Sequence, residues 1–209
     1  MTDTRERLLE ATLQTLRERG IAGLSARTIA ATAGVNQALV FYHFKTVDQL
    51  VVEASKAGAR ERADSYRTRF AAVTSLRGLL ALGRELHEEE SERGNVTVLA
   101  QVLAGARHDE RLVPAAREAL GQWVDEIEPV LSRLLEGSPL AEAIDVPGLA
   151  RGIAAAFIGL ELYDGVDPEG SDQAFAALDQ LGVLVDVFDD LGAAGRLAVR
   201  RRVRRAKRD

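Results

Sequence analysis

The stretch AGVNQALVFYHFKT, residues 33–46, sets polar side chains within a hydrophobic run. Upstream of it, Ser25 can cap a helix that runs to about Ala33, and Gly34 then supplies a tight turn. Asn36 can cap a second, short helix. Two short helices joined in this way predict a helix–turn–helix, the motif that lays its second helix in the major groove of DNA.

The predicted second helix has two faces, which explains its mixed composition. Val35, Val40 and Phe44 are expected to pack against the preceding helices and hold it rigid, and Phe41 is expected in the core as well. The side chains expected to face solvent or DNA are Asn36, Gln37, Leu39, Tyr42 and His43.

The rest of the chain is also expected to be helical, because apolar residues recur at three- and four-residue spacing and no long period-two stretch appears. Capping boxes are expected at Asp3–Glu6 and at Thr46–Gln49. In the first helix Leu9, Leu13 and Leu16 are expected to face inward. Besides the two helices of the motif, the expected helices span about residues 3–20, 46–70, 75–94, 96–106, 110–136, 145–163 and 172–191.

Two features are expected to interrupt the later helices. Pro129 is expected to kink the helix over 110–136, because proline removes a backbone donor. The segment DGVDPEGS, residues 164–171, is expected to form a loop. The predicted fold class is all-α, with an N-terminal three-helix helix–turn–helix domain and a C-terminal helical domain for ligand binding and dimerisation.

The charge is distributed unevenly along the 209 residues. The net charge of −5 combines +2 over residues 1–45, −14 over the middle and +7 over residues 196–209. A polyanion is therefore expected to meet the two ends of the chain more readily than its middle. The absence of cysteine fits a reducing cytoplasm. The sequence shows no pattern of a signal peptide and no apolar run of about 20 residues that would predict a membrane-spanning helix. The predicted location is therefore the cytoplasm, with no membrane partner.

The segment LSARTIAATAGVNQALVFYHFKTVDQLV, residues 24–51, resembles the DNA-binding signature of the TetR/AcrR family of transcriptional repressors. The signature is an Arg-x-Ile-Ala segment, then Ala-Gly-Val, then an aromatic pair before His-Phe and Lys. The residues that carry the resemblance are Arg27, Ile29, Ala30, Ala33, Gly34, Val35, Phe41, Tyr42, His43, Phe44 and Lys45. It covers about residues 5–52, and the remainder is similar only in length and helical plan.

The resemblance implies a role for each DNA-facing residue. It places Arg27, Gln37 and Leu39 at base-reading positions, where Arg suits guanine and Gln suits adenine. It places Tyr42, His43, Lys45, Ser25, Thr28 and Thr46 at phosphate-contacting positions, two of them beside the positive helix N-termini that follow Ser25 and Thr46. The expected DNA-binding residues are Ser25, Arg27, Thr28, Asn36, Gln37, Leu39, Tyr42, His43, Lys45 and Thr46.

Two positions in this segment depart from the family pattern. Leu39 replaces a small or polar residue, and Val47 stands where the family often has Lys. Base preference therefore does not follow from the resemblance, and one phosphate contact is expected to be missing.

The expected domains are residues 1–46 for DNA binding, residues 47–195 for effector binding and dimerisation, and residues 196–209 as a basic tail. A dimer is expected because one short recognition helix reads few bases. Two apolar stripes either face their own core or, as in the four-helix bundle of the resembled family, meet a partner. The stripe residues assigned to dimerisation are Ile153, Phe157, Leu160, Phe175, Leu178, Leu181, Val185 and Phe188.

An effector site is expected among polar residues with apolar neighbours. The candidates are His87, Arg107, His108, Trp123, Phe157 and Glu161, with Asp164 beside them. The alternative is that the acidic run over 87–90 is a solvated face and that residues 107–109 form a loop. An uncharged or weakly polar ligand is expected, because the helices are rich in aliphatic residues.

No catalytic or metal-binding residues and no cofactor are expected. The sequence contains no Gly-rich phosphate loop and no metal-binding or nucleophile motif. The function that these features predict is a ligand-responsive regulator, most simply a repressor, that binds a palindromic operator as a dimer. The alternatives are a helical enzyme or a structural helical protein, and activation is an alternative to repression. The arginine-rich tail either contacts DNA or folds back on the acidic middle of the chain.

Overall fold

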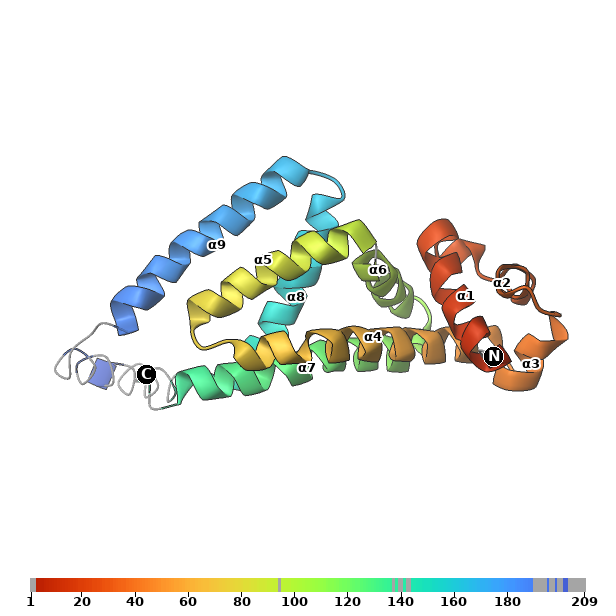
Figure 1. Cartoon of the computed structure of the whole chain (residues 1–209), viewed down its shortest axis with the longest axis horizontal. Coiled ribbons are helices and arrows are strands. Elements are labelled where there is room, and N and C mark those ends of the chain that lie inside the picture. Colours follow the sequence, from red (N-terminus) through yellow and green to blue (C-terminus); the bar gives the residue numbers. More distant parts are fainter. Residues whose placement is uncertain are drawn as a thin grey trace. The chain divides into compact units, whose positions relative to one another are not determined.

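The computed structural model describes residues 3–93, 95–136, 138, 141, 144–189, 195, 198 and 201–202. Over these residues the chain forms α-helices and 3-10 helices (η), with no strand (Figure 1), as the sequence predicts. The elements are α1 (Thr4–Arg19), η1 (Ile21–Gly23), α2 (Ala26–Ala33), α3 (Ala38–Phe44), α4 (Val47–Ala72), α5 (Leu76–Arg93), α6 (Asn95–Ala106), η2 (Glu110–Leu112), α7 (Val113–Leu135), α8 (Val146–Asp164) and α9 (Pro168–Asp189).

The contacts divide the chain into two compact units. The first unit comprises Met1–Ser65 and Glu90–Gln122, and the second comprises Tyr66–Glu89 and Trp123–Asp209. The helices α4, α5 and α7 contribute residues to both units. The domain boundaries expected at residues 46/47 and 195/196 separate functions rather than compact units. They stay a prediction.

Three short helices, α1 to α3, share one apolar core in the first unit (Figure 1). Leu8, Ile29, Val40, Phe44 and Leu50 have no exposed surface. Burying a side chain of this size contributes about 1.5–3 kcal/mol. The inward packing expected for Val40 and Phe44 is confirmed, and Val35 packs against the same core, half-buried.

The remainder of the first unit packs around the C-terminal end of α1 and the start of α7. Val102, Ala115 and Ala116 form a small buried cluster there. At Gly105 on α6, an added Cβ would lie 2.8 Å from the terminal methyl groups of both Ile21 and Leu112. The lack of a side chain at Gly105 therefore lets η1 and η2 approach α6 closely.

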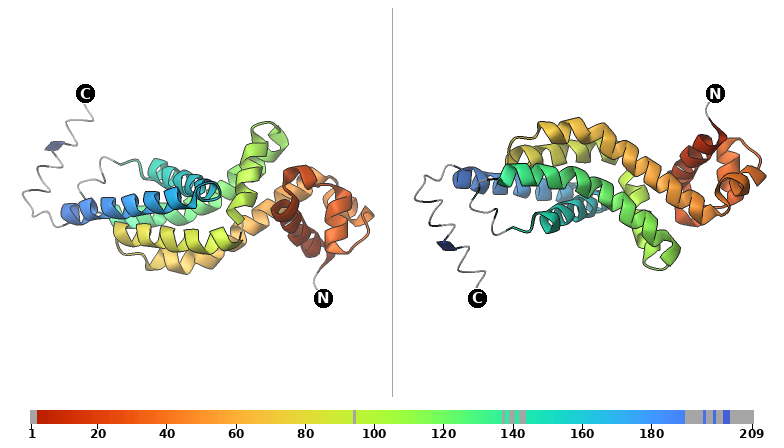
Figure 2. Two further views of the ribbon diagram at one scale, coloured as in Figure 1. Left: turned by 90° about the horizontal axis from the view of Figure 1, so that it is seen from above. Right: turned by 90° about the horizontal axis from the view of Figure 1, so that it is seen from below.

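The second unit has its own core, built from the end of α4, from α5 and α8, and from the second half of α7. Leu82, Leu86, Leu131 and Ala150 are among its buried residues. The helices α8 and α9 make many contacts where a short turn joins them (Figure 2). The guanidinium of Arg133 donates to the carbonyl of Val73 at 2.9 Å, which ties α7 to the turn that follows α4.

Several local expectations need correction. Asp3 precedes α1, but its side chain makes no capping hydrogen bond and Glu6 is exposed, so the capping box expected there does not form. The inner face of α1 is rotated from the expected one: Leu16 is buried as expected, but Leu9 and Leu13 are only half-buried. The buried side chains of α1 are Leu8, Ala11, Thr12, Thr15 and Leu16.

The expected loop over residues 164–171 is also wrong in extent. The helix α9 already begins at Pro168, because proline suits the first turn of a helix and Asp167 Oδ1 accepts the Gly170 N–H at 3.0 Å. The loop between α8 and α9 therefore shrinks to Gly165–Asp167.

The helix α8 is more apolar than the sequence analysis predicts. By length and composition alone α8 could cross a membrane, and only 17% of that window is buried within the chain. Its polar residue Glu161, however, bonds His87 of α5 at 2.6 Å, so one side of α8 packs within the second unit. The exposed small residues of α8 are Gly148, Gly152, Ala155, Ala156 and Gly159.

Gly34 and Gly121 of the first unit are expected to respond in opposite ways to replacement by alanine. Gly34 has φ +63, whereas Gly121 lies within α7 and an added Cβ there would have no atom within 4 Å. We expect Gly34→Ala to lower the free energy of unfolding by about 1 kcal/mol or more, because alanine is strained at positive φ. Gly121→Ala should raise it by up to about 1 kcal/mol, since alanine favours helix. Urea denaturation measures both, and equal effects would contradict the assigned turn geometry.

Candidate nucleic-acid interface and buried polar cluster

The start of α2 is fixed by a capping box. The Ser25 hydroxyl accepts the Thr28 N–H at 3.1 Å, and the Thr28 hydroxyl accepts the Ser25 N–H at 2.9 Å. The Thr28 hydroxyl also lies within hydrogen-bonding distance, 2.9 Å, of the Gly23 carbonyl oxygen. Both predicted phosphate-contacting hydroxyls thus define this helix end, and Arg27 between them is exposed to solvent.

The turn between α2 and α3 is closed from both sides. Gly34 adopts the left-handed conformation, and its N–H lies within hydrogen-bonding range of the Ala30 and Ala31 carbonyls. From α1, Arg7 Nη2 donates to the carbonyl of Ala33 at 2.5 Å and to that of Gly34 at 3.2 Å. A charged donor on otherwise unpaired carbonyls of a helix end is stabilising.

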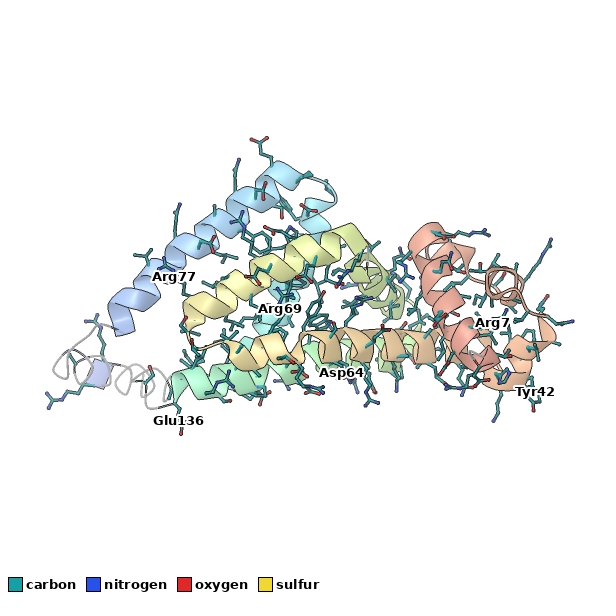
Figure 3. All side chains as sticks on the ribbon, viewed as in Figure 1. Arg7, Tyr42, Asp64, Arg69, Arg77 and Glu136 are labelled. Atoms are coloured by element: carbon teal, nitrogen blue, oxygen red, sulfur yellow. The ribbon has the colours of Figure 1, made fainter. Side chains whose placement is uncertain are left out.

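The helix α3 presents a polar and aromatic face. The residue that precedes α3 is Gln37, which makes no side-chain capping bond, but Asn36 one position earlier accepts the Ala38 N–H through Oδ1 at 2.9 Å. Gln37 is exposed, and Tyr42 is 80% exposed and points away from the ribbon (Figure 3). The imidazole of His43 meets the Tyr42 ring edge-on, with centroids 5.0 Å apart.

One residue of α3 was expected in the core and is not there. Phe41 is 48% exposed, whereas Val40 and Phe44, at three- to four-residue spacing on the inner face, are fully buried. A helix of only seven residues has room for two large inward side chains, so Phe41 joins the outer face beside Tyr42. Leu39 is half-buried at the edge of that face.

The link from α3 to α4 is strained. Lys45 has φ +61, the one non-glycine residue at positive φ in the described part of the chain. Such a conformation costs on the order of 1–3 kcal/mol and is often found at functional sites. Thr46 follows, and its hydroxyl accepts the Gln49 N–H at 3.1 Å, which caps α4 and leaves its positive end beside exposed Lys45.

The ten predicted DNA-binding residues therefore lie along α2, α3 and the two capped helix starts. Each retains exposed or half-exposed surface: Ser25, Arg27, Thr28, Asn36, Gln37, Leu39, Tyr42, His43, Lys45 and Thr46. The surface combines cations, amides, hydroxyls and helix N-termini, the groups that bind phosphates and base edges. Their contact with DNA stays a prediction.

A second polar site lies inside the second unit, and we name it the His87 cluster. It comprises His87 of α5 and the carboxylates of Glu161 and Asp164 of α8. His87 Nδ1 and Glu161 Oε1 are 2.6 Å apart, and His87 Nε2 lies 3.7 Å from Asp164 Oδ1. With the carboxylate as acceptor, Nδ1 carries the proton. The side chains of His87 and Glu161 are 9% and 5% exposed.

Aromatic rings border this cluster. The ring of Phe175 lies over His87, with centroids 4.5 Å apart. Phe157 precedes Glu161 by one turn of α8, and its centroid is 6.5 Å from that of Trp123. Trp123 in turn stacks on Tyr66 at 6.1 Å. The structure thus brings together four of the predicted effector residues: His87, Trp123, Phe157 and Glu161.

The other two effector candidates belong to the first unit. Arg107 and His108 are exposed on the turn that ends α6, which confirms the alternative interpretation of this segment as a loop. On the same turn, Asp109 accepts hydrogen bonds from Arg111, and these lower the pKa of its carboxyl group.

The alternative interpretation of residues 87–90 as a solvated face is wrong at both ends of the run. His87 is 7% and Glu90 1% exposed. The carboxylate of Glu90 lies 3.8 Å from Arg62 and 3.6 Å from Arg93 in the first unit. Glu90 continues the spacing of Leu79, Leu82 and Leu86, and this spacing is the sequence signal that indicates an inward position.

The predicted dimerisation residues are divided by the structure. Ile153 and Phe157 pack against the core of their own unit, and Phe175 is 5% exposed, so little of its surface remains for a partner. Leu160 and Leu178 are half-buried. The side chains of Leu181, Val185 and Phe188 lie outside the described residues. The role of these stripes in dimerisation stays a prediction.

Comparisons with known proteins cover most of the chain. Residues 8–54 match the family model of bacterial regulatory proteins of the tetR family, and residues 74–181 match that of the BetI-type transcriptional repressor C-terminal domain. The HTH-type transcriptional regulator BetI 2 of Chromohalobacter salexigens is 27% identical, over 91% of this chain and 94% of its own. An uncharacterized HTH-type transcriptional regulator of Mycobacterium tuberculosis is 26% identical, over 80% and 85%.

Solved structures agree with these relatives. A TetR-family transcriptional regulator from Rhodococcus sp. superimposes with a TM-score of 0.70 at 25% identity, over 88% of this chain and 99% of its own. The multidrug binding protein EbrR, complexed with proflavin, superimposes with a TM-score of 0.57 at 26% identity, over 86% and 99%. Both the sequence matches and the fold indicate a regulator rather than an enzyme.

Because the helix–turn–helix and the helical C-terminal part both match, this chain belongs to the TetR family of bacterial transcriptional regulators.

Proposed function

We propose that this protein is a cytoplasmic, ligand-responsive repressor that binds a palindromic operator as a homodimer. The observation that carries the proposal is the recognition surface. It combines exposed Arg27, Gln37, Phe41 and Tyr42 on a rigid three-helix core with two capped helix N-termini. Cations and helix ends hold phosphates, while arginine and amide side chains read base edges.

Support for a dimer comes from the exposed side of α8. This helix is apolar, but most of it is not covered by its own chain. Larger apolar side chains are exposed as well: Leu149 and Leu162 of α8, and Val183 of α9. Apolar surface of this kind is stabilised by burial, and a second copy supplies a matching surface by two-fold symmetry. Two recognition helices then read two half-sites.

Support for an effector comes from the His87 cluster and from EbrR, which was crystallised with proflavin. A ligand bound in the second unit would act through a helix that both units share. The helix α4 begins at the Thr46 cap beside the recognition helix and reaches Tyr66 and Phe70 of the second core. A shift of α4 would change the separation of the two recognition helices and weaken operator binding.

The first test concerns base reading. We expect Arg27→Ala and Gln37→Ala each to weaken binding to the selected operator by about 1–3 kcal/mol and to relax preference at one or two base pairs. Phe41→Ala should also weaken binding, and it should lower the free energy of unfolding by only about 1 kcal/mol, because half of its ring is exposed. Fluorescence anisotropy with DNA selected from a random pool measures affinity and preference.

Gln180→Ala, at an exposed glutamine of α9, is the matched control and should bind as the wild type does. If Arg27→Ala and Gln37→Ala both leave the consensus and the affinity unchanged, the recognition surface lies elsewhere. A reporter gene behind the selected operator then separates repression from activation by the sign of its response.

The second test concerns assembly. Ala155 and Gly159 are exposed on α8, so glutamate at either position can reach solvent within the protomer. In a dimer that buries this face, the unpaired carboxylate is costly. We expect Ala155→Glu and Gly159→Glu to give folded monomers by sedimentation, with operator affinity lowered roughly 10²–10⁴-fold. Ala81→Glu on α5 is the control for added charge, and dimers that persist in both α8 variants would exclude this face as the interface.

A further inference from the structure

We propose that the recognition helix α3 reads A·T base pairs through its apolar outward face, with the ring of Phe41 in contact with the 5-methyl group of a thymine. This base preference rests on the proposed operator binding, and it adds the class of base pair that the site takes. It assigns a specificity-determining role to Phe41, a residue that the sequence analysis places in the core.

The recognition helix lacks the side chains that discriminate G·C pairs best. From Thr28 through Phe44 the chain contains no Asp, Glu, Lys or Arg. Guanine is read most often by the cation of arginine or lysine, and cytosine by a carboxylate. The imidazole of His43 is half-buried and meets the ring of Tyr42 edge-on. The groups on α3 therefore favour A·T pairs.

The cations around α3 belong to neighbouring segments and are accounted for separately. Arg7 of α1 donates to the two carbonyls of the turn that precedes α3, and Arg5 of α1 pairs with Glu53 of α4. Arg27 is exposed on α2, and Lys45 is exposed after α3 has ended. A guanine in the operator is therefore expected to be read from α2, next to the base pairs that α3 covers.

The outward face of α3 is largely apolar. Ala38 and Tyr42 lie one turn apart and form the outermost ridge of the helix, because residues four apart share a face. Tyr42 is 80% exposed and points away from the ribbon (Figure 3). Phe41 and Leu39 lie on the two sides of this ridge, Phe41 with 48% of its surface exposed and Leu39 half-buried. A base edge in front of α3 therefore meets carbon atoms over most of the helix.

The chemistry of the major groove decides which base such a face selects. The 5-methyl group distinguishes thymine from the other bases there, and apolar side chains read it by contact. Gln37 is exposed one turn before Phe41, and its amide can bond the N6 and N7 atoms of adenine. An amide beside an exposed ring thus matches neighbouring A·T pairs. Burial of one methyl group contributes about threefold to fivefold in affinity.

Uracil tests this contact directly, because it differs from thymine only in lacking the 5-methyl group. The full-length protein is bound to its selected operator in fluorescence anisotropy, and each thymine of one half-site is replaced by uracil in turn. We expect at least one replacement to weaken binding about threefold to fivefold. Uracil placed in flanking DNA outside the operator is the control and should leave the affinity unchanged.

Protein variants then assign the contact to Phe41. Phe41→Ala should weaken binding to the thymine operator and abolish the thymine–uracil difference at one position, the non-additivity that two groups in contact show. Phe41→Tyr keeps the ring and should retain the difference. Leu9→Ala is the matched control, because Leu9 packs from α1 against the same three-helix core and is not on the α3 face. It should lower stability and keep the full sensitivity to uracil.

Two outcomes would overturn the base preference: the wild type binds every uracil operator as tightly as the thymine operator, or Phe41→Ala keeps the wild-type sensitivity at every thymine. If Phe41→Ala does not fold, Phe41→Gln replaces it, since a glutamine tolerates the exposed position and lacks the ring. An insensitive uracil scan leaves operator binding itself intact. If no DNA is enriched from the random pool, operator binding fails, and the base preference fails with it.

Discussion

The reversal of the chain at Gly34 is the constraint on which the DNA-binding end of this protein depends. The left-handed conformation of Gly34 ends α2, and Arg7 of α1 bonds the carbonyls of Ala33 and Gly34 on the other side of the turn. This arrangement lets Val40 and Phe44 reach the same core as Ile29. The orientation of α3, and hence of every outward side chain on it, follows from a turn that only a residue tolerant of positive φ adopts cheaply.

Stability and recognition use the same groups in this region. The hydroxyls of Ser25 and Thr46 satisfy backbone N–H groups at the starts of α2 and α4, and these are the helix ends proposed to meet phosphate. Lys45 lies between α3 and α4 at positive φ, a strain that the flanking helices impose. This conformation fixes the backbone from which the exposed Lys45 side chain projects toward the proposed phosphate contact.

The second unit follows a different principle, because its interior is not purely apolar. The pairing of His87 with Glu161 adds little net stability, since removing such groups from water offsets much of their attraction. A core of leucine and valine at these positions would be as stable or more so.

The sequence by itself determined the helix–turn–helix, because its signals are local. The serine cap and the glycine turn each act within four residues and lie where predicted, and Asn36 bonds the first N–H of α3 although Gln37 is the residue at its boundary. The same holds for the start of α4 at Thr46. Local signals also misled: residues 164–171 were expected to form a loop, although Pro168 and Asp167 together start α9.

The tertiary structure alone decided which side chains meet and which remain exposed. No spacing in the sequence places Glu161 beside His87, 74 positions away, because their contact depends on how α5 and α8 pack. The outward position of Phe41 depends in the same way on the room beneath α3, which Val40 and Phe44 already fill. Periodicity gives the faces of a helix, but the partner of each face is fixed only by the packing of distant segments. For that reason the sequence could name His87, Glu161 and Asp164 as candidates, while their pairing followed only from the tertiary structure.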